Sequence, residues 1–136
     1  MSNTILNNVA SYLTNLSATN EICTALGSTI VGNTNLFMYT EPSADVDAIT
    51  LIPYGGVQPN KDGFRQESVI QIRMKSSSKQ TLISTQQAII NTLHMNTLNG
   101  NGLMISNTSI PIIVGELEGG QYTVSTTNFR IKHIKV

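Results

Sequence analysis

Hydrophobic and polar residues alternate most clearly at positions 67–75, in the run Glu-Ser-Val-Ile-Gln-Ile-Arg-Met-Lys. In an extended chain Ile70, Ile72 and Met74 fall on one side, and Gln71, Arg73 and Lys75 fall on the other. The pattern predicts a strand with one buried face and one face that meets solvent or a partner.

The hydrophobic period changes to three and four after the serines at positions 76–78, whose hydroxyl groups can cap a helix. Residues 79–96 are predicted to form one long helix. Its inward stripe consists of Leu82, Ile83, Gln86, Ile89, Ile90 and Leu93. This helix can lie across a sheet and cover the apolar face of the preceding strand, so the rest of the chain is expected to organise around this unit.

Two further helices are expected before the first strand. Residues 4–16 are amphipathic, and residues 21–26 form a short helical piece capped by Asn20 and stopped by Gly27. Cys23 lies inside this piece, where a small buried apolar residue is favoured over a nucleophile.

Short runs of good β formers predict the remaining strands at residues 36–40, 48–52, 103–105, 110–117, 121–125 and 129–136. Pro53 is expected to end the second run, and residues 54–65 to form a projecting loop or hairpin arm that contacts a neighbour. Gly119 and Gly120 predict a tight hairpin turn. The hydrophobic phase slips along the last run, which predicts a kink or bulge at residues 126–128 and a bulge near Lys132 or His133. Alternatively, a neighbouring subunit covers the second face of the last strand.

The order of elements predicts an α+β fold with an antiparallel or mixed sheet. An N-terminal helix and one long helix cover one face of that sheet, and the hairpin loop projects from it. The length of 136 residues predicts a single domain spanning residues 1–136.

Composition changes the picture mainly through charge. Only 12% of the residues are charged, roughly half the usual share, and the net charge is +0. A surface covered by Asn, Ser and Thr is weakly guarded against association, which favours a protein used in an assembly. A neutral β-rich binding domain is the alternative. The balance offers no electrostatic footprint for nucleic acid. Cys23, the one cysteine, allows no internal disulfide and fits a reducing cytosol.

No pattern in the chain predicts catalysis, a cofactor or a metal. His94 near the end of the long helix and His133 in the last strand have no acid or cysteine at metal-ligand spacing. Asp45 with Asp47 is expected to be a solvated turn, with weak cation binding as the alternative. Glu116 and Glu118 could in principle share acid–base work, but a wet hairpin tip is favoured. The glycine pairs lack the context of a phosphate cradle, and no segment approaches the roughly 20 apolar residues of a membrane span.

Three features together resemble the small minor capsid and tail terminator proteins of long-tailed bacteriophages. They are Tyr-Gly-Gly-Val-Gln-Pro at positions 54–59, Val-Ile-Gln-Ile-Arg at positions 69–73 with its following helix, and the β-hairpin finish. The resemblance implies a non-enzymatic α+β subunit without cofactors. Its ring, hexameric by that resemblance, would end the tail tube and join it to head-completion or stopper proteins, with DNA passing through the lumen. It also implies a place in the virion at the neck or tail end, after assembly in the host cytoplasm.

Subunit-interface candidates are taken from the wet face of the organising strand, the glutamates and the predicted loop. They are Tyr54, Gly55, Gly56, Gln58, Pro59, Arg65, Glu67, Gln71, Arg73, Lys75, Glu116 and Glu118. Arg73 is expected to pair with a carboxylate of the next subunit. The alternatives are a tail tube protein, a head-completion stopper or adaptor, and a free-standing binding module, which the absence of Trp disfavours as a sugar binder.

Overall fold

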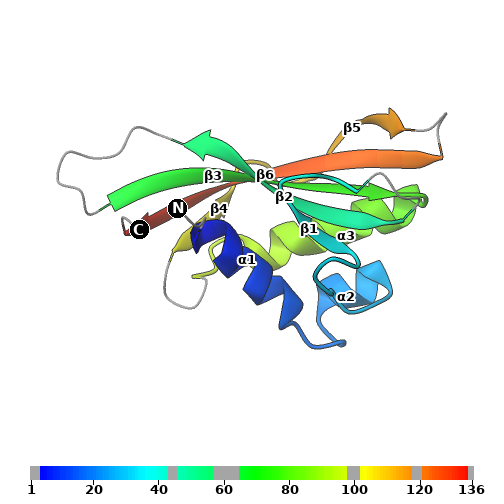
Figure 1. Cartoon of the computed structure of the whole chain (residues 1–136), viewed down its shortest axis with the longest axis horizontal. Helices are drawn as coiled ribbons and strands as arrows, with labels where there is room; N and C mark the ends of the chain where they lie inside the picture. Colours follow the sequence, from blue (N-terminus) through cyan, green and yellow to red (C-terminus); the bar gives the residue numbers. More distant parts are fainter. Residues whose placement is uncertain (1–3, 43–45, 57–64, 98–101, 118–120, 135–136) are drawn as a thin grey trace.

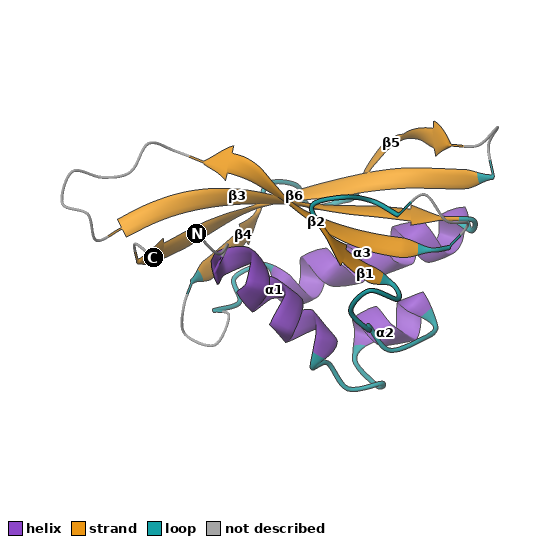
Figure 2. Cartoon of the chain, viewed as in Figure 1, coloured by secondary structure: helices purple, strands orange, loops and turns teal. Residues whose placement is uncertain are grey.

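The computed structural model describes residues 4–42, 46–56, 65–97, 102–117 and 121–134, and every structural statement below is limited to them. Helices and strands follow in the order α1 (Thr4–Thr14), α2 (Glu21–Leu26), β1 (Leu36–Met38), β2 (Ala48–Gly56), β3 (Arg65–Ser76), α3 (Lys79–Leu93), β4 (Leu103–Ser106), β5 (Ile112–Leu117) and β6 (Tyr122–Ile134). The three helices lie on one side of a single sheet, which confirms the predicted α+β fold (Figures 1 and 2). The opposite side is called the outer face.

The sheet has six strands in the order β1-β2-β3-β6-β4, and β5 also pairs with β6. Only β1 and β2 run parallel, so the sheet is mixed. β3 occupies one edge of β6 along nearly its whole length, while β5 and β4 share the other edge end to end. β5 and β6 form the predicted hairpin, although its predicted glycine turn lies outside the described residues.

The β3–β6 ladder runs from Arg65 opposite Ile134 to Ser76 opposite Thr123 without a register shift. The predicted kink at residues 126–128 and the predicted bulge near Lys132 or His133 are therefore wrong. For the kink, the hydrophobic pattern misled because Ser125 and Thr127 are buried polar residues on the helix-facing side of the strand. A uniform partner strand keeps β6 straight through them.

The core lies between the sheet and the helices. Ile70, Ile72 and Met74 of β3 are buried, as predicted, with Ile49 and Leu51 of the neighbouring strand opposite them on the same face. Each fully buried side chain of this kind contributes about 1.5–3 kcal/mol. The predicted stripe of α3 is also buried, except Ile83, whose side chain is exposed.

Gln86 explains how a polar residue can belong to the buried stripe of α3. Its Nε2 donates to the carbonyl oxygens of Ile72 (3.1 Å) and Ser125 (3.3 Å), and its Oε1 accepts from Thr127 Oγ1 (3.2 Å). A buried amide satisfied in this way avoids the cost of an unpaired polar group, and it ties the helix to both central strands.

The helix ends follow local capping chemistry. The Oδ1 of Asn20 accepts from the N–H of Ile22, and Gly27 ends α2 in the left-handed region at φ 85°, as predicted. Ser78 Oγ accepts from the N–H of Thr81 at the start of α3. The helix ends at Leu93 rather than residue 96. α1 likewise ends at Thr14 rather than residue 16.

Two predicted strand ends are corrected. β1 ends at Met38 because Tyr39 adopts φ 73°, outside the extended region. β2 does not end at Pro53 but continues to Gly56, with a register shift between those two residues. The N–H of Ile49 donates to the oxygen of Asn35, and the oxygen of Leu51 accepts from the N–H of Tyr39, so the backbone groups of both residues point toward β1. Every second residue of a strand has the same orientation, so Pro53 faces the same side. β1 has already ended there, so the N–H that proline lacks is not needed for pairing with β1. Part of the predicted loop is thus strand, and residues 57–64 lie outside the described residues.

Candidate assembly surface

The polar residues of β3 on the outer face have partners inside the same chain. Gln71 Nε2 donates to Asn128 Oδ1 (3.2 Å), and Arg73 Nε donates to Glu41 Oε1 (3.0 Å). Glu41 belongs to the same chain and is not among the glutamates named above as interface candidates, Glu67, Glu116 and Glu118. Whether Arg73 also contacts another subunit stays a prediction.

Lys75 was predicted to lie on a wet face, and this is wrong. Its side chain is only 2% exposed. Its Nζ donates to the carbonyl oxygen of Pro42 (2.7 Å) and lies 5.3 Å from the ring centre of Tyr122. The cation is stabilised by a carbonyl oxygen and an aromatic face while its stem is covered.

The segment between β1 and β2 supplies hydrogen-bond partners for both cations. Besides Glu41 and Pro42, it contributes Asp47, whose carboxylate accepts from Ser76 Oγ (2.8 Å) and the N–H of Ser77 (3.1 Å). Asp47 therefore holds the end of β3 and is more than a solvated turn residue. Among the described residues no group of three or more His, Cys, Asp or Glu could hold a metal ion.

The other interface candidates are scattered. Tyr54, Gly55 and Gly56 end β2, and Arg65 begins β3. Gln58, Pro59 and Glu118 lie outside the described residues. The two remaining glutamates form ion pairs within the chain, between Glu67 Oε1 and Arg130 Nη1 (3.7 Å) and between Glu116 Oε2 and Lys79 Nζ (3.6 Å). The structure does not gather these candidates into one site.

A different surface stands out at β5. Ile112, Ile113 and Val114 are all large apolar residues with exposed side chains, and Ile110 just before the strand is exposed as well. Ile83 of α3 lies beside Ile113, since both line a groove between α3 and β5. The other residues of its lining are Lys79, Gly115, Glu116 and Thr123. We call Ile83, Ile110, Ile112, Ile113 and Val114 the β5 surface.

The backbone of β5 is also open. β6 pairs with one edge of this strand, and no described strand pairs with the other. Exposed hydrophobic edge strands are places where another chain can add a strand. Figure 1 shows β5 at the end of the sheet away from both marked termini.

The other short edge strands are closed by their own chain. At β1, the oxygen of Leu36 accepts from Asn33 and its N–H donates to the oxygen of Val31. At β4, the N–H of Met104 donates to the oxygen of Asn96, and its oxygen accepts from the N–H of Met95. These turns occupy backbone groups that a partner strand would need.

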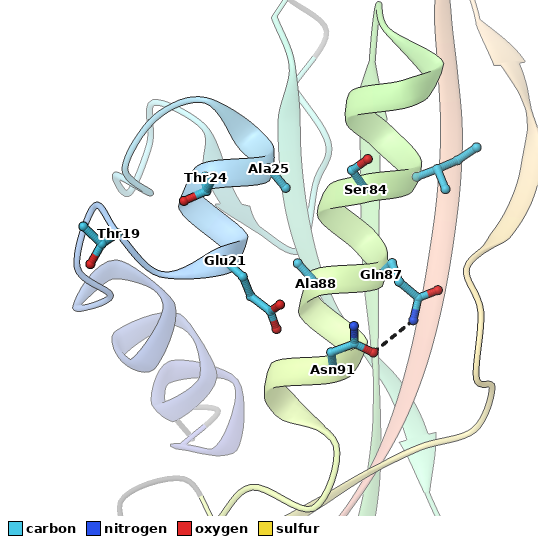
Figure 3. A pocket seen from close by; sticks show the side chains of 9 residues that line it. Thr19, Glu21, Thr24, Ala25, Ser84, Gln87, Ala88 and Asn91 are labelled. Carbon is cyan, nitrogen blue, oxygen red and sulfur yellow. Dashed lines mark hydrogen bonds between the residues drawn. The ribbon is translucent and has the colours of Figure 1, made fainter.

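The helix layer carries a second, shallower groove between α2 and α3 (Figure 3). Its lining combines short polar side chains, including Thr24, Ser84 and Asn91, with the apolar Ala25, Ile83 and Ala88. Gln87 Nε2 donates to Asn91 Oδ1 (3.1 Å). Glu21, the one charged residue in its lining, accepts from Thr92 Oγ1 (2.9 Å). The groove therefore offers little convergent chemistry for a substrate.

His94 and Cys23 have structural explanations. His94 caps the end of α3, and its Nδ1 accepts from the N–H of Ser106 (3.0 Å). Cys23 is buried in the core, as predicted. Among the described helices, none is long and apolar enough to cross a membrane.

Sequence reasoning did not select the β5 surface or Glu41. The signal for β5 was present, because three consecutive apolar residues cannot all point inward from an alternating strand. Pro111 directly before them is typical of an edge. No comparable local signal connects Glu41 with Arg73, since the contact depends on how the β1–β2 connection crosses the sheet.

Comparison with known families adds the identity. A family model described as bacteriophage tail terminator protein matches residues 18–132, from just before α2 to near the end of β6. None of the curated proteins matches the chain. Since the family match covers most of the chain and the predicted α+β fold is present, the chain belongs to the bacteriophage tail terminator family and is a structural protein of the phage tail.

Proposed function

We propose that this protein forms a closed ring, most simply of six copies, at the end of the phage tail tube. The ring stops the tube from growing and offers a docking face to the head-completion or neck proteins. DNA passes through its lumen without sequence-specific contacts. The protein acts in the virion after assembling in the host cytoplasm, as a single domain and without a catalytic step.

The observation that carries the proposal is the β5 surface in a member of this family. A ring requires each subunit to present surfaces that its neighbours cover. The exposed side chains of Ile112, Ile113 and Val114, on a strand with one open edge, are unfavourable in water and favourable in such a contact. The low charge of the chain supports the same reading.

The test is complementation of a phage that lacks this gene, with electron microscopy of the resulting particles. Wild-type protein is expected to restore joined particles with a ring at one end of the tail and a uniform tube length. Without it, tubes are expected to be overlong or detached from heads. Normal, joined tails in its complete absence would overturn the proposal.

Antibody labelling of the same particles separates the neighbouring roles. Label at the head-proximal end of the tail supports a terminator. Label along the whole tail would identify a tube protein, and label retained on tailless heads would identify a stopper or adaptor.

A further inference from the structure

The sheet has a second vacant edge besides β5. β1 pairs with β2 only at Ile49, Thr50 and Leu51. Beyond Leu51, β2 continues to Gly56 with β3 on one side and no described strand on the other. We call residues 52–56 the vacant half of β2.

We infer that, within the ring proposed above and resting on that proposal, β5 of one copy pairs with the vacant half of β2 of the next copy. The occupant of the β5 edge is thus a second copy of this chain. The pairing would join neighbouring sheets into one continuous sheet around the ring.

The strand directions fit this arrangement. β2 and β6 are each antiparallel to β3 and therefore run the same way, and β5 is antiparallel to β6. When sheets follow one another head to tail, β5 meets the neighbour's β2 in antiparallel orientation. This is the more stable kind of pair.

The closed edges also fit. Along the direction of β2, β1 lies beside its beginning, and the vacancy lies beside its end. Along the parallel β6, β5 lies beside the beginning and β4 beside the end. If β5 of one copy fills the vacancy beside β2 of the next, β4 of the first copy falls beyond the end of that β2. β1 of the second copy lies beside the beginning of the same β2 and contacts neither strand. The vacant half and β5 have similar lengths, five and six residues. Pro53 has no N–H to donate across this edge, so at that residue the pairing uses its carbonyl oxygen alone.

The required stagger is physically reasonable. Residues 52 and 53 of β2 pair with residues 71 and 70 of β3, which in turn pair with residues 128 and 129 of β6. β5 pairs with residues 122–126 of β6, nearer the beginning of that strand. Filling the vacancy therefore shifts each copy along the strands by about 6 residues, or about 20 Å at about 3.3 Å per residue. Between two successive contacts each copy contributes four strands side by side, β2, β3, β6 and β5, which span about 19 Å at about 4.8 Å per strand. A shift of about 20 Å over this width corresponds to a strand tilt near about 45°, within the usual range for closed sheets.

The surfaces brought together are alike in chemistry. Tyr54 in the vacant half and Val114 in β5 are each 56% exposed. The vacant half contains no charged residue, and the one charged residue of β5 is Glu116 near its end. Pairing β5 with β5 would instead create a two-fold contact that closes as a dimer and cannot continue around a ring.

Cysteine cross-linking in assembled particles tests the pairing. A chain carrying both Tyr54→Cys and Val114→Cys is treated with a short bismaleimide and separated on a denaturing gel. Cys23 is buried and stays in place. We expect a ladder of covalent species larger than dimers, because each copy carries both halves of the contact. Particles containing a mixture of the two single variants should give dimers at most.

The matched control combines Val114→Cys with Asn7→Cys, which is exposed on α1 in the helix layer, and should stay monomeric. Monomers from the Tyr54→Cys, Val114→Cys chain in particles whose ring is visible would overturn the pairing and leave the proposed function standing. Dimers from Val114→Cys alone would show two-fold pairing and also overturn it. Particles with no ring of this protein would remove the proposed function and the pairing together.

Discussion

The outer face of β3 and the edge of β5 present opposite kinds of surface. On β3, Arg73 and Lys75 are charged, yet each has a partner within the chain, and Lys75 is almost fully covered. On β5, Ile112, Ile113 and Val114 are apolar, and their exposed side chains sit on an edge that no described strand covers. Polar side chains on a strand are thus a poor guide to where a partner binds. What matters is whether the chain already satisfies them.

The largest expected effect comes from placing a charge on β5. Ile113→Lys should lower incorporation into particles at least about 100-fold, because a lysine in a desolvated strand contact has no partner. Subunit stability should change by no more than about 0.5 kcal/mol, since the residue is a surface position. Incorporation is measured by quantitative immunoblotting of purified particles, and stability by urea unfolding.

Val31→Lys is the matched control, because Val31 and Ile113 have the same exposed fraction, 48%, and Val31 lies in the turn that closes β1. It should be incorporated normally. Equal loss for both variants would remove the distinction between an open and a closed edge.

The next effect concerns the buried cation on β3. Lys75→Ala should destabilise the subunit by about 2 kcal/mol, since it removes the hydrogen bond to Pro42, the contact with Tyr122 and a buried aliphatic stem. Lys75→Met keeps the stem and should lose less. Urea denaturation of the purified variants measures both, and an unchanged midpoint for Lys75→Ala would contradict the buried position.

A smaller effect is expected for the Arg73–Glu41 pair, which is partly exposed. A double-mutant cycle with Arg73→Ala and Glu41→Gln should give a coupling free energy of about 0.5–1 kcal/mol in subunit unfolding. Incorporation of the same variants tests the separate prediction that Arg73 also serves the ring, in which case Arg73→Lys would restore it only in part. Zero coupling would mean that the ion pair does not form in solution.

The smallest effect belongs to the Lys79–Glu116 pair at the rim of the groove beside β5. Both side chains are mostly exposed, so Glu116→Gln should change the free energy of unfolding by less than about 0.5 kcal/mol. Thermal melting at low and high salt provides the measurement. A change above about 1 kcal/mol would show that the rim is more closely packed than its exposure indicates.

Sequence patterns predicted the parts of the fold that depend on local chemistry. The alternation of Ile70, Ile72 and Met74 and the capping residues Asn20, Gly27 and Ser78 were sufficient to place β3, α2 and the start of α3. These features report burial and hydrogen bonding within a few residues along the chain.

The errors occurred where distant segments decide the outcome. Pro53 is tolerated because β1 ends at Met38, which lies opposite Leu51, two residues before Pro53. No local sequence pattern reveals where the neighbouring strand ends. The buried position of Thr127 in β6 depends on Gln86, whose Oε1 accepts from Thr127 Oγ1 across the helix–sheet boundary. The burial of Lys75 requires Pro42 from another connection. Each of these is a tertiary contact that overrides a local preference.

The uninterrupted β3–β6 ladder has a mechanical consequence. A force applied along these strands in opposite directions loads all of their twelve paired positions together, whereas a force across them opens one pair at a time. The subunit should therefore resist stretching far better along its long strands than across them. Single-molecule pulling from cysteines at the ends of β3 and β6, compared with pulling across the sheet, would measure this anisotropy.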